Sequence, residues 1–410
     1  MKETSPKILI WDLDINLKNS GGPAGYLYNL REYLNQNNIE SNIFFLKDLL
    51  GIENNTITLH LKYKKLIDFI NKIDILRIWS RINVLRKYFK LWKGEIKQER
   101  IGDIDINEFD IIHFHISPHI IKAQKLLDNY HGKIVLTTHS PEPLSYECVS
   151  EIVSNYSILK YFLKGRMEKL ELSAWKRTDY LMFPVKEAIE PYNVSIKLKK
   201  YLLDNSEKTI FCPTSILDKN ISPEKDIFTS KLNIPENAFI ITYVGRHSEV
   251  KGYNELVKLG KVILPKYPNV YFIIAGNYSK DQILNHPRWI ELGWINYGAT
   301  LISSSDLFIL PNKETYFDIV ALEVLRSGTP IMMSLTGGNK YFKSLVLNQG
   351  LMFYNYGDIQ AQESLINNIL HKNMEERDNM RIANRNLFLS QFTMEQFCIR
   401  YQKLMQDIIA

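Results

Sequence analysis

The chain has 410 residues, of which 45% are hydrophobic and 23% charged, a balance typical of a globular protein and not of a disordered one. At about 150 residues per domain, this length predicts two or three domains. The three cysteines, Cys148, Cys212 and Cys398, are far apart in the sequence. They predict neither a metal-binding pair nor a disulfide framework, and so favour the reducing cytoplasm.

The N-terminal half alternates short apolar runs with segments of helical length, which predicts a parallel, doubly wound sheet. A glycine loop, Ser20-Gly21-Gly22-Pro23-Ala24-Gly25, opens the first helical pattern, which continues to Leu34. The strands are expected at residues 7–11, 39–45, 110–115, 133–137, 180–184 and 209–213.

Residues 62–100 concentrate the positive charge of the chain. They hold twelve Lys and Arg against four acidic residues, a net charge of +8, whereas the whole chain carries +6. Apolar residues at helix-like spacing interleave with these cations, which favours a basic amphipathic helix on an anionic membrane surface. An exposed helix that covers the N-terminal domain is the equally weighted alternative. Since the charge is confined to one segment, we expect no nucleic-acid partner. No apolar run is long enough to span a membrane.

The C-terminal half repeats the rhythm after a polar segment, residues 216–236, which is predicted to be an interdomain linker. Strands are expected at residues 239–244, 269–275, 289–292, 306–310 and 330–334, and helices near 254–264, 319–325 and 391–409. The domains are therefore predicted at 1–216 and 217–392, with a C-terminal helix, 393–410, packing back on the first. In such sheets, ligands bind at the carboxyl ends of the strands.

Two cations and one carboxylate stand at expected strand ends of the C-terminal half, and a second carboxylate lies in an expected helix. Arg246 and Lys251 flank a loop and a helix start, which suits a diphosphate; a solvated surface pair is the alternative. Glu323 lies in an apolar helix, where a carboxylate is costly unless it is paired or bound to a ligand. It could accept two ribose hydroxyls, or be a satisfied core acid. Glu314 precedes that helix.

The N-terminal half offers a lone histidine and a glycine loop. His139 follows Thr137-Thr138 at a strand end, and Gly21-Gly22 at a helix start would let backbone N–H groups approach a phosphate or sugar. His113 and His115 alternate on one strand, and we favour a packing role for them. The D-x-D sequences at 12–14 and 103–105 have no supporting ligand nearby, so no metal site is predicted.

Together these motifs resemble the retaining GT-B glycosyltransferases of the glycogen-synthase and phosphatidylinositol-mannosyltransferase superfamily, the "group 1" transferases. The resemblance covers nearly the whole chain in family order. Gly21-Gly22 looks like the family's glycine loop, Thr138-His139-Ser140 like its T-x-H strand end, Gly245-Arg246…Lys251-Gly252 like its phosphate clamp, Gly293-Trp294 like the strand end that meets the base, and Glu323…Gly328-Thr329-Pro330 like its second glutamate with a G-T-P turn.

One departure concerns the paired glutamates, which the family usually separates by seven residues. Here eight residues separate Glu314 and Glu323. When the motif is aligned from Glu323, Thr315 falls on the first glutamate, and Phe317-Asp318 falls on the usual Phe-Gly. Either Glu314 or Thr315 would therefore orient the sugar, and Asp318 would add a carboxylate near it.

The resemblance implies an α/β, GT-B architecture with two Rossmann-like domains that face a central cleft, the first binding the acceptor and the second the donor. It implies metal-independent, retaining transfer of a hexose or N-acetylhexosamine from a nucleotide-diphosphate sugar, by default a UDP-sugar. The acceptor would be a glycan, glycolipid or protein-linked group in surface polysaccharide or glycoconjugate biosynthesis. No cofactor is expected, and the protein is placed in the cytoplasm or at the inner face of the cell membrane.

The residues implied for this reaction fall into two sets. Those expected at the reacting centre are His139, Arg246, Lys251, Glu314 and Thr315. Those expected to bind the donor are Gly21, Gly22, Gly245, Gly293, Trp294, Phe317, Asp318, Ile319, Val320 and Glu323. The displaced first glutamate leaves one main alternative, a catalytically impaired GT-B-like scaffold or partner-binding subunit; a sugar-nucleotide epimerase of the same fold matches the spacing less well.

Overall fold

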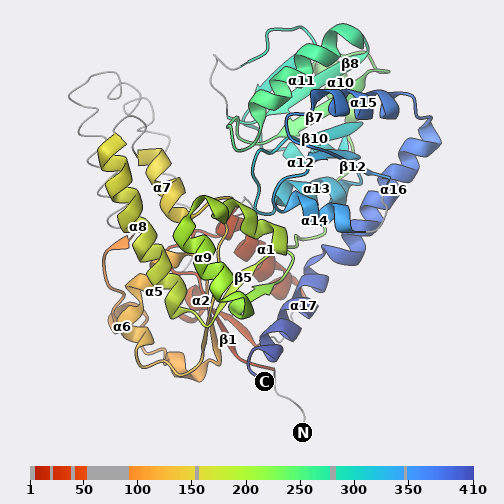
Figure 1. Ribbon diagram of the computed structural model, residues 1–410. Coiled ribbons are helices and arrows are strands. Elements are labelled where there is room, and N and C mark those ends of the chain that lie inside the picture. The colour runs from red at the N-terminus through yellow and green to blue at the C-terminus, as the bar shows by residue number, and fades with distance from the viewer. Residues whose placement is uncertain are drawn as a thin grey trace. The chain divides into compact units, whose positions relative to one another are not determined.

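A computed structural model of the chain describes residues 5–18, 22–37, 42–52, 92–152, 157–277, 283–345 and 349–410. The chain divides into two compact units (Figure 1). Unit 1 comprises Met1–Phe183, Tyr192–Cys212 and Arg400–Ala410, and unit 2 comprises Pro184–Pro191 and Pro213–Ile399. The assignment of an acceptor domain and a donor domain to residues 1–216 and 217–392 stays a prediction.

Unit 1 is built on a six-stranded sheet in the order β2-β1-β3-β4-β5-β6, with every pairing parallel. Its strands are β1 (Ile8–Trp11), β2 (Ile43–Phe45), β3 (Ile111–Phe114), β4 (Lys133–Thr137), β5 (Tyr180–Phe183) and β6 (Thr209–Phe211). All residues of β1 and β3 are buried, as expected of a parallel sheet that is covered on both faces.

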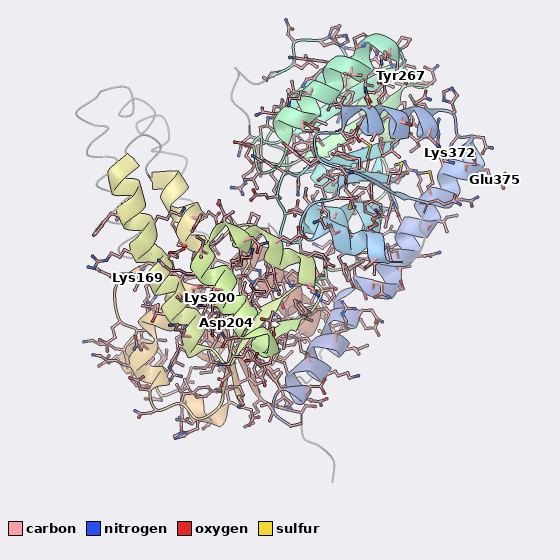
Figure 2. The ribbon with its side chains drawn as sticks, in the orientation of Figure 1. Lys169, Lys200, Asp204, Tyr267, Lys372 and Glu375 are labelled. Atoms are coloured by element: carbon pink, nitrogen blue, oxygen red, sulfur yellow. The ribbon has the colours of Figure 1, made fainter. Side chains whose placement is uncertain are left out.

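Short and long helices surround this sheet. They are α1 (Gly22–Gln36), α2 (Leu46–Leu49), η1 (Gln98–Arg100), η2 (Ile106–Glu108), α5 (Ser117–Lys122), α6 (Gln124–Leu127), α7 (Leu144–Ile152), α8 (Ser157–Arg177), η3 (Lys186–Val194), α9 (Ile196–Asp204) and η4 (Ser206–Lys208). Helix α9 shows the usual amphipathic arrangement. Leu198 and Leu202 are buried, whereas Lys200 and Asp204 lie on its exposed side (Figure 2).

Unit 2 contains a second six-stranded sheet, also parallel throughout, in the order β12-β11-β10-β7-β8-β9. The strands are β7 (Phe239–Val244), β8 (Val270–Ala275), β9 (Trp289–Gly293), β10 (Leu307–Leu310), β11 (Ile331–Ser334) and β12 (Leu351–Tyr354). The helices are α10 (Lys225–Lys231), α11 (Tyr253–Lys266), α12 (Gly298–Ser303), α13 (Ile319–Ser327), α14 (Asn339–Ser344), α15 (Ile359–Leu370), α16 (Met374–Gln391) and α17 (Met394–Asp407).

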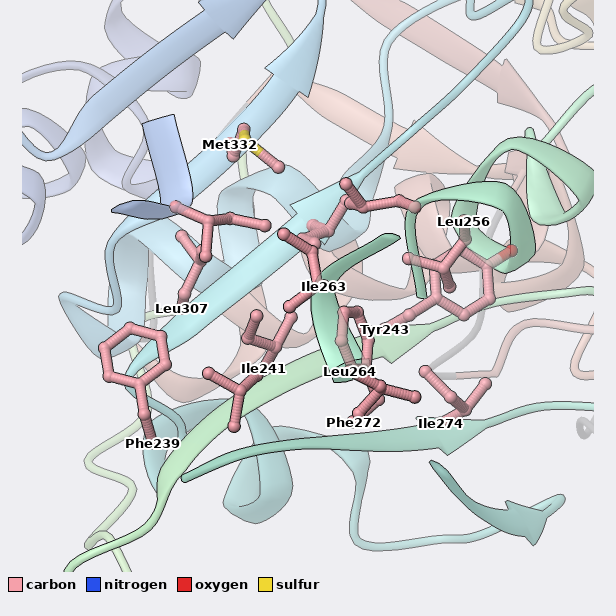
Figure 3. Close-up of a cluster of buried hydrophobic side chains, with 14 of the residues drawn as sticks. Phe239, Ile241, Tyr243, Leu256, Ile263, Leu264, Phe272, Ile274, Leu307 and Met332 are labelled. Carbon is pink, nitrogen blue, oxygen red and sulfur yellow. The ribbon is translucent and has the colours of Figure 1, made fainter. Parts of the chain in front are cut away.

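The core of unit 2 lies on both faces of this sheet. Alternate residues of β7 point to opposite sides of the sheet. Phe239, Ile241 and Tyr243 therefore pack in a cluster with α11, whereas Ile240 packs in a second cluster with Phe228 on the opposite face. Figure 3 shows the first cluster, in which Leu256, Ile263 and Leu264 of α11 meet Phe272 and Ile274 of β8.

Most predicted strands are confirmed, but three expectations need correction. The predicted linker contains α10, because Phe228 of this helix is buried against the sheet with Ile240 and Ile273. The strand β12 was not expected. The start of the expected last helix, 391–409, also needs correction: α17 begins at Met394, and Gln391 is the last residue of the separate helix α16. The end of α17, from Arg400, belongs to unit 1, where the Tyr401 hydroxyl lies 2.7 Å from Nδ1 of His113.

Two predictions fall on residues that the structure does not describe, namely Gly21 and most of the basic segment, residues 62–91. At the described end of that segment, Trp92 is 2% exposed. Its ring is therefore packed inside the protein and is not available to a lipid surface. Among the described helices, none combines the length and the apolar character that a membrane span requires.

Candidate active site

The loop between β7 and α11 carries both predicted cations, and a glycine fixes its end. Gly252 has a left-handed backbone conformation, with φ +69°, and a Cβ there would lie 1.6 Å from the carbonyl oxygen of Pro311. Only glycine tolerates both conditions. The loop is consequently pressed against the segment that follows β10, and Lys251 stands beside that segment.

The segment after β10, residues 311–318, is held on its other side by the loop after β11. The amides of Lys313 and Glu314 donate to the Val250 carbonyl at 2.9 and 3.3 Å. The Gly338 amide donates to the Thr315 carbonyl at 3.2 Å, and a Cβ at Gly337 would lie 2.0 Å from the same oxygen. Backbone contacts on both sides thus fix the segment that holds Glu314, Thr315 and Asp318.

Lys251 and Asp318 form an ion pair between these two loops. The Lys251 ammonium contacts Oδ1 of Asp318, and the Asn312 amide donates to Oδ2 of the same carboxylate. Arg246 lies in the same loop as Lys251, and its side chain is exposed. The Tyr243 hydroxyl donates to the Arg246 carbonyl at 2.7 Å. Unit 2 therefore carries both cations at the carboxyl end of β7, and Asp318 follows the adjacent strand β10.

The two candidates for the first-glutamate role differ in accessibility. Glu314 is half-buried. Thr315 is 0% exposed, and its hydroxyl has no hydrogen-bond partner within the described part of the chain. A ligand can reach Glu314 in this arrangement, whereas it can reach Thr315 only after the segment moves.

Helix α13 begins directly after Asp318, so Ile319 and Val320 form its first turn. Glu323 follows in the next turn, and Gly328 ends the helix in a left-handed conformation, as predicted. Burial raises the pKa of the half-buried Glu323 carboxyl, while the charges of Arg326 and Lys219 lower it. The described residues offer this carboxylate no hydrogen-bond partner, so its oxygens can accept ligand hydroxyls. The ring of Phe317 belongs to the core and stacks on Phe342, with centroids 5.2 Å apart.

Three glycines join the ends of β7, β8 and β9. The Gly245 amide donates to the Ala275 carbonyl at 2.9 Å, and the Gly276 amide donates to the Gly293 carbonyl at 2.8 Å. A Cβ at Gly276 would lie 1.8 Å from the Gly245 carbonyl oxygen. Trp294, the next residue along the chain, is 71% exposed. An open aromatic surface thus follows a tightly packed strand end.

A polar cluster that sequence reasoning missed supports the loop with the cations. His247 stacks on Tyr253 with ring centroids 3.9 Å apart, and the Tyr253 hydroxyl donates to Glu291 at 2.5 Å. The Trp289 indole donates to the same carboxylate at 2.9 Å. Burial lowers the pKa of His247 to about 4, so its ring is neutral near pH 7. A carboxylate inside the apolar run 289–293 was the available signal.

His139 lies in unit 1, at the end of β4, and its ring belongs to a stack of histidines. Its Nε2 is 3.0 Å from Nδ1 of His115, and the His113 and His115 rings are 4.2 Å apart. His113 also contacts Thr137 at 2.7 Å. Burial lowers the pKa of His113 and His139 to about 3, so both rings are neutral near pH 7. These contacts agree with the packing role favoured for His113 and His115.

Three acidic residues of the D-x-D sequences, Asp12, Asp14 and Asp105, make contacts within unit 1. Asp12 accepts a hydrogen bond from the Lys47 amide at 2.9 Å, and burial raises its pKa to about 6. Asp14 pairs with Arg100, and Asp105 accepts from the Asn107 amide at 2.9 Å at the start of η2.

The structure thus places Gly245, Arg246, Lys251, Asp318 and Glu314 at adjoining strand ends of unit 2, beside the start of α13, while His139 and Gly22 belong to unit 1. Lys251 lies beside the start of α13, and with Arg246 in the same loop it is suited to bind an anion. Two doubly wound units, each with a six-stranded parallel sheet, are the architecture of a GT-B protein.

Comparisons with known proteins define the class more closely. The chain is 24% identical over 293 residues to the uncharacterized glycosyltransferase MJ1607 of Methanocaldococcus jannaschii, covering 66% of this chain and 68% of that protein. It is 22% identical over 315 residues to the O-antigen biosynthesis glycosyltransferase WclY of Escherichia coli, covering 74% and 80%. The structure of Anabaena Alr3699/HepE in complex with UDP and glucose aligns with a TM-score of 0.59 at 14% identity, covering 98% of this chain and 99% of that chain.

Residues 224–387 match the family described as "Glycosyl transferases group 1". Residues 224–387 form a group 1 glycosyl transferase domain, and the chain is a glycosyltransferase of GT-B fold, which confirms the group and the fold that its motifs predicted.

Proposed function

We propose that this glycosyltransferase moves a hexose or N-acetylhexosamine from a UDP-sugar to a glycan or lipid-linked acceptor of surface polysaccharide biosynthesis. In this proposal the anomeric configuration is retained and no metal takes part. The uridine donor is supported by the HepE structure, which contains UDP, and the pathway by the O-antigen transferase WclY. The observation that carries the proposal is the position of Lys251 beside Asp318 and the start of α13.

The chemical problem is the negative charge that develops on the leaving diphosphate. In our proposal Arg246 and Lys251 neutralise it, helped by the partial positive charge at the start of α13. The reaction then needs no metal to hold the diphosphate. Half-buried surroundings strengthen the contribution of Lys251, because its side chain is only 19% exposed and water screens it less than a surface lysine.

The sugar and the ribose are assigned to carboxylates. We assign Glu314 rather than Thr315 to the sugar hydroxyls, since Glu314 is accessible and Thr315 is buried. Glu323 accepts the ribose hydroxyls, and Trp294 offers an exposed ring to the base. The ring of His139 is neutral, so in this proposal its backbone carbonyl, not an imidazolium, faces the sugar as positive charge develops.

A panel of donors tests the function. Among UDP-, GDP- and ADP-sugars, only uridine donors are expected to raise the melting temperature of the protein. With a lipid-linked glycan acceptor, mass spectrometry is expected to show an added hexose or N-acetylhexosamine, and UDP release is expected to require the acceptor. Stabilisation by GDP-sugars alone, or UDP release without sugar transfer, would contradict the proposal.

Two neighbouring variants extend this panel as matched controls. Glu314→Gln is expected to lose discrimination among donor sugars, because a neutral amide holds a hydroxyl less strongly than a carboxylate does. Thr315→Val keeps the buried shape and is expected to leave donor preference unchanged. If Thr315→Val alone changed the preference, the assignment of Glu314 would be wrong. If no donor bound to any variant, the scaffold alternative would gain support.

We also propose peripheral contact with an anionic membrane through residues 62–100. The support is the net charge of +8 in this segment, with about 1 kcal/mol of attraction per cation near the lipid. The protein is expected to float with vesicles that contain phosphatidylglycerol at low salt and to be released at high salt, because ions screen this attraction. Failure to float at either salt concentration would contradict the contact.

A further inference from the structure

The side chain of Asp318 forms an ion pair with Lys251, the residue that the proposed function assigns to the diphosphate. One carboxylate oxygen contacts the Lys251 ammonium, and the other accepts from the Asn312 amide. Both members of the ion pair are largely shielded from water, with side-chain exposures of 19% for Lys251 and 16% for Asp318. The pair joins loops that are 67 residues apart in the sequence, so it exists only in the folded protein.

Asp318 pairs with Lys251 although its position in the chain favours a different hydrogen bond. Asp318 is the N-cap residue of α13, where an aspartate normally accepts a hydrogen bond from the second or third helical amide. In the described structure its side chain makes no such bond. The Ala321 amide donates to the backbone carbonyl of Asp318 at 3.0 Å, while the carboxylate is turned to Lys251. Asp318 therefore acts on the cation instead of capping the helix.

We propose that Asp318 is an internal counter-ion of Lys251, which the diphosphate of the donor must displace and which weakens retention of the nucleotide product. This inference deepens the proposed function and depends on it. The Asp318 carboxylate and a diphosphate compete for the same ammonium, and two anions held close together repel each other. Asp318 consequently lowers the affinity of the site for any diphosphate, and the effect reaches the ligand through Lys251.

The competing interpretation is that Asp318 holds Lys251 in the position that suits the ligand. The two interpretations predict opposite signs. A counter-ion that must be displaced weakens diphosphate binding, so its neutralisation strengthens binding. A carboxylate that orients the lysine improves binding, so its neutralisation weakens binding.

The test is titration calorimetry of the full-length chain with two probes, UDP and inorganic pyrophosphate. Asp318→Asn keeps the shape of the side chain and removes its charge. This variant is expected to bind both probes about tenfold more tightly than the unmodified protein, which corresponds to 1.4 kcal/mol. In a Lys251→Ala background the same change is expected to have less than a third of that effect, because the lysine that couples the two anions is gone.

Glu249→Gln provides the matched control, since it removes one negative charge from the loop that carries Lys251. Glu249 pairs at 2.5 Å with Lys313, which is exposed, and not with Lys251. Its neutralisation is expected to change the dissociation constants by less than twofold. If Glu249→Gln and Asp318→Asn increased the affinity for UDP and pyrophosphate equally, the effect would come from the net charge of the site and the proposal would be overturned.

The remaining outcomes separate this inference from the proposed function. If Lys251→Ala weakens UDP binding but Asp318→Asn weakens it too or leaves it unchanged, the counter-ion is disproved and the proposed function survives. If Lys251→Ala binds UDP as well as the unmodified protein does, the proposed function fails. Asp318→Gly serves as a second variant, with folding checked by circular dichroism. If neither variant folds, Asp318 is a structural residue and the counter-ion is disproved.

Discussion

Alanine in place of Lys251 is expected to lower the turnover of the UDP-sugar by about 100-fold or more, since removing one group that stabilises developing negative charge commonly costs this much. Arg246→Ala is expected to have a similar effect. The two variants differ in their structural cost. Arg246 is exposed, so its removal leaves the fold intact, whereas the loss of Lys251 leaves the Asp318 carboxylate with the Asn312 amide alone.

Initial rates at saturating acceptor, with folding checked by circular dichroism, measure this effect. Lys313→Ala is the matched control, because Lys313 is an exposed lysine in the neighbouring segment and pairs with Glu249. It is expected to retain turnover within about twofold, as is usual for an exposed ion pair that is screened by water. Normal turnover in both Arg246→Ala and Lys251→Ala would remove the basis for placing the diphosphate here.

The fold could be predicted well from the sequence because both sheets are parallel and covered on two faces. A strand of this kind is a short continuous apolar run, and 239–244 was predicted with the bounds that β7 has in the structure. The pattern failed where few residues are buried. Helix α10 buries only Phe228 and Thr229, so its sequence resembles a linker.

The candidate site was only partly predictable, because some of its contacts exist only in the folded chain. Arg246 and Lys251 could be found from their place after a strand. The ion pair with Asp318 could not be found, since nothing local to either residue indicates it. The choice between Glu314 and Thr315 was open for the same reason: one extra residue changes the spacing, and only burial shows which side chain a ligand can reach.

The contact between Gly252 and Pro311 sets the position of Lys251, and the substitution Gly252→Ala, which adds one methyl group, tests this role. In Gly252→Ala the new Cβ would lie 1.6 Å from the Pro311 carbonyl oxygen, so one of the two loops must move. A left-handed alanine adds about 1 to 2 kcal/mol of its own. We expect the free energy of unfolding to fall by about 3 kcal/mol or more. Turnover is expected to fall about 100-fold, because a displacement of about 1 Å at a positioned group has that effect.

Gly357→Ala separates the close contact from the backbone conformation. Gly357 also has a positive φ, +89°, but a Cβ there meets no atom within 4 Å. The free energy of unfolding of this variant is expected to fall only by the conformational cost of about 1 to 2 kcal/mol. Its turnover is expected to be unchanged. Urea denaturation and initial rates of both variants provide the comparison. Equal losses of stability, with turnover retained in both, would mean that the approach of Gly252 to Pro311 does not hold Lys251 in place.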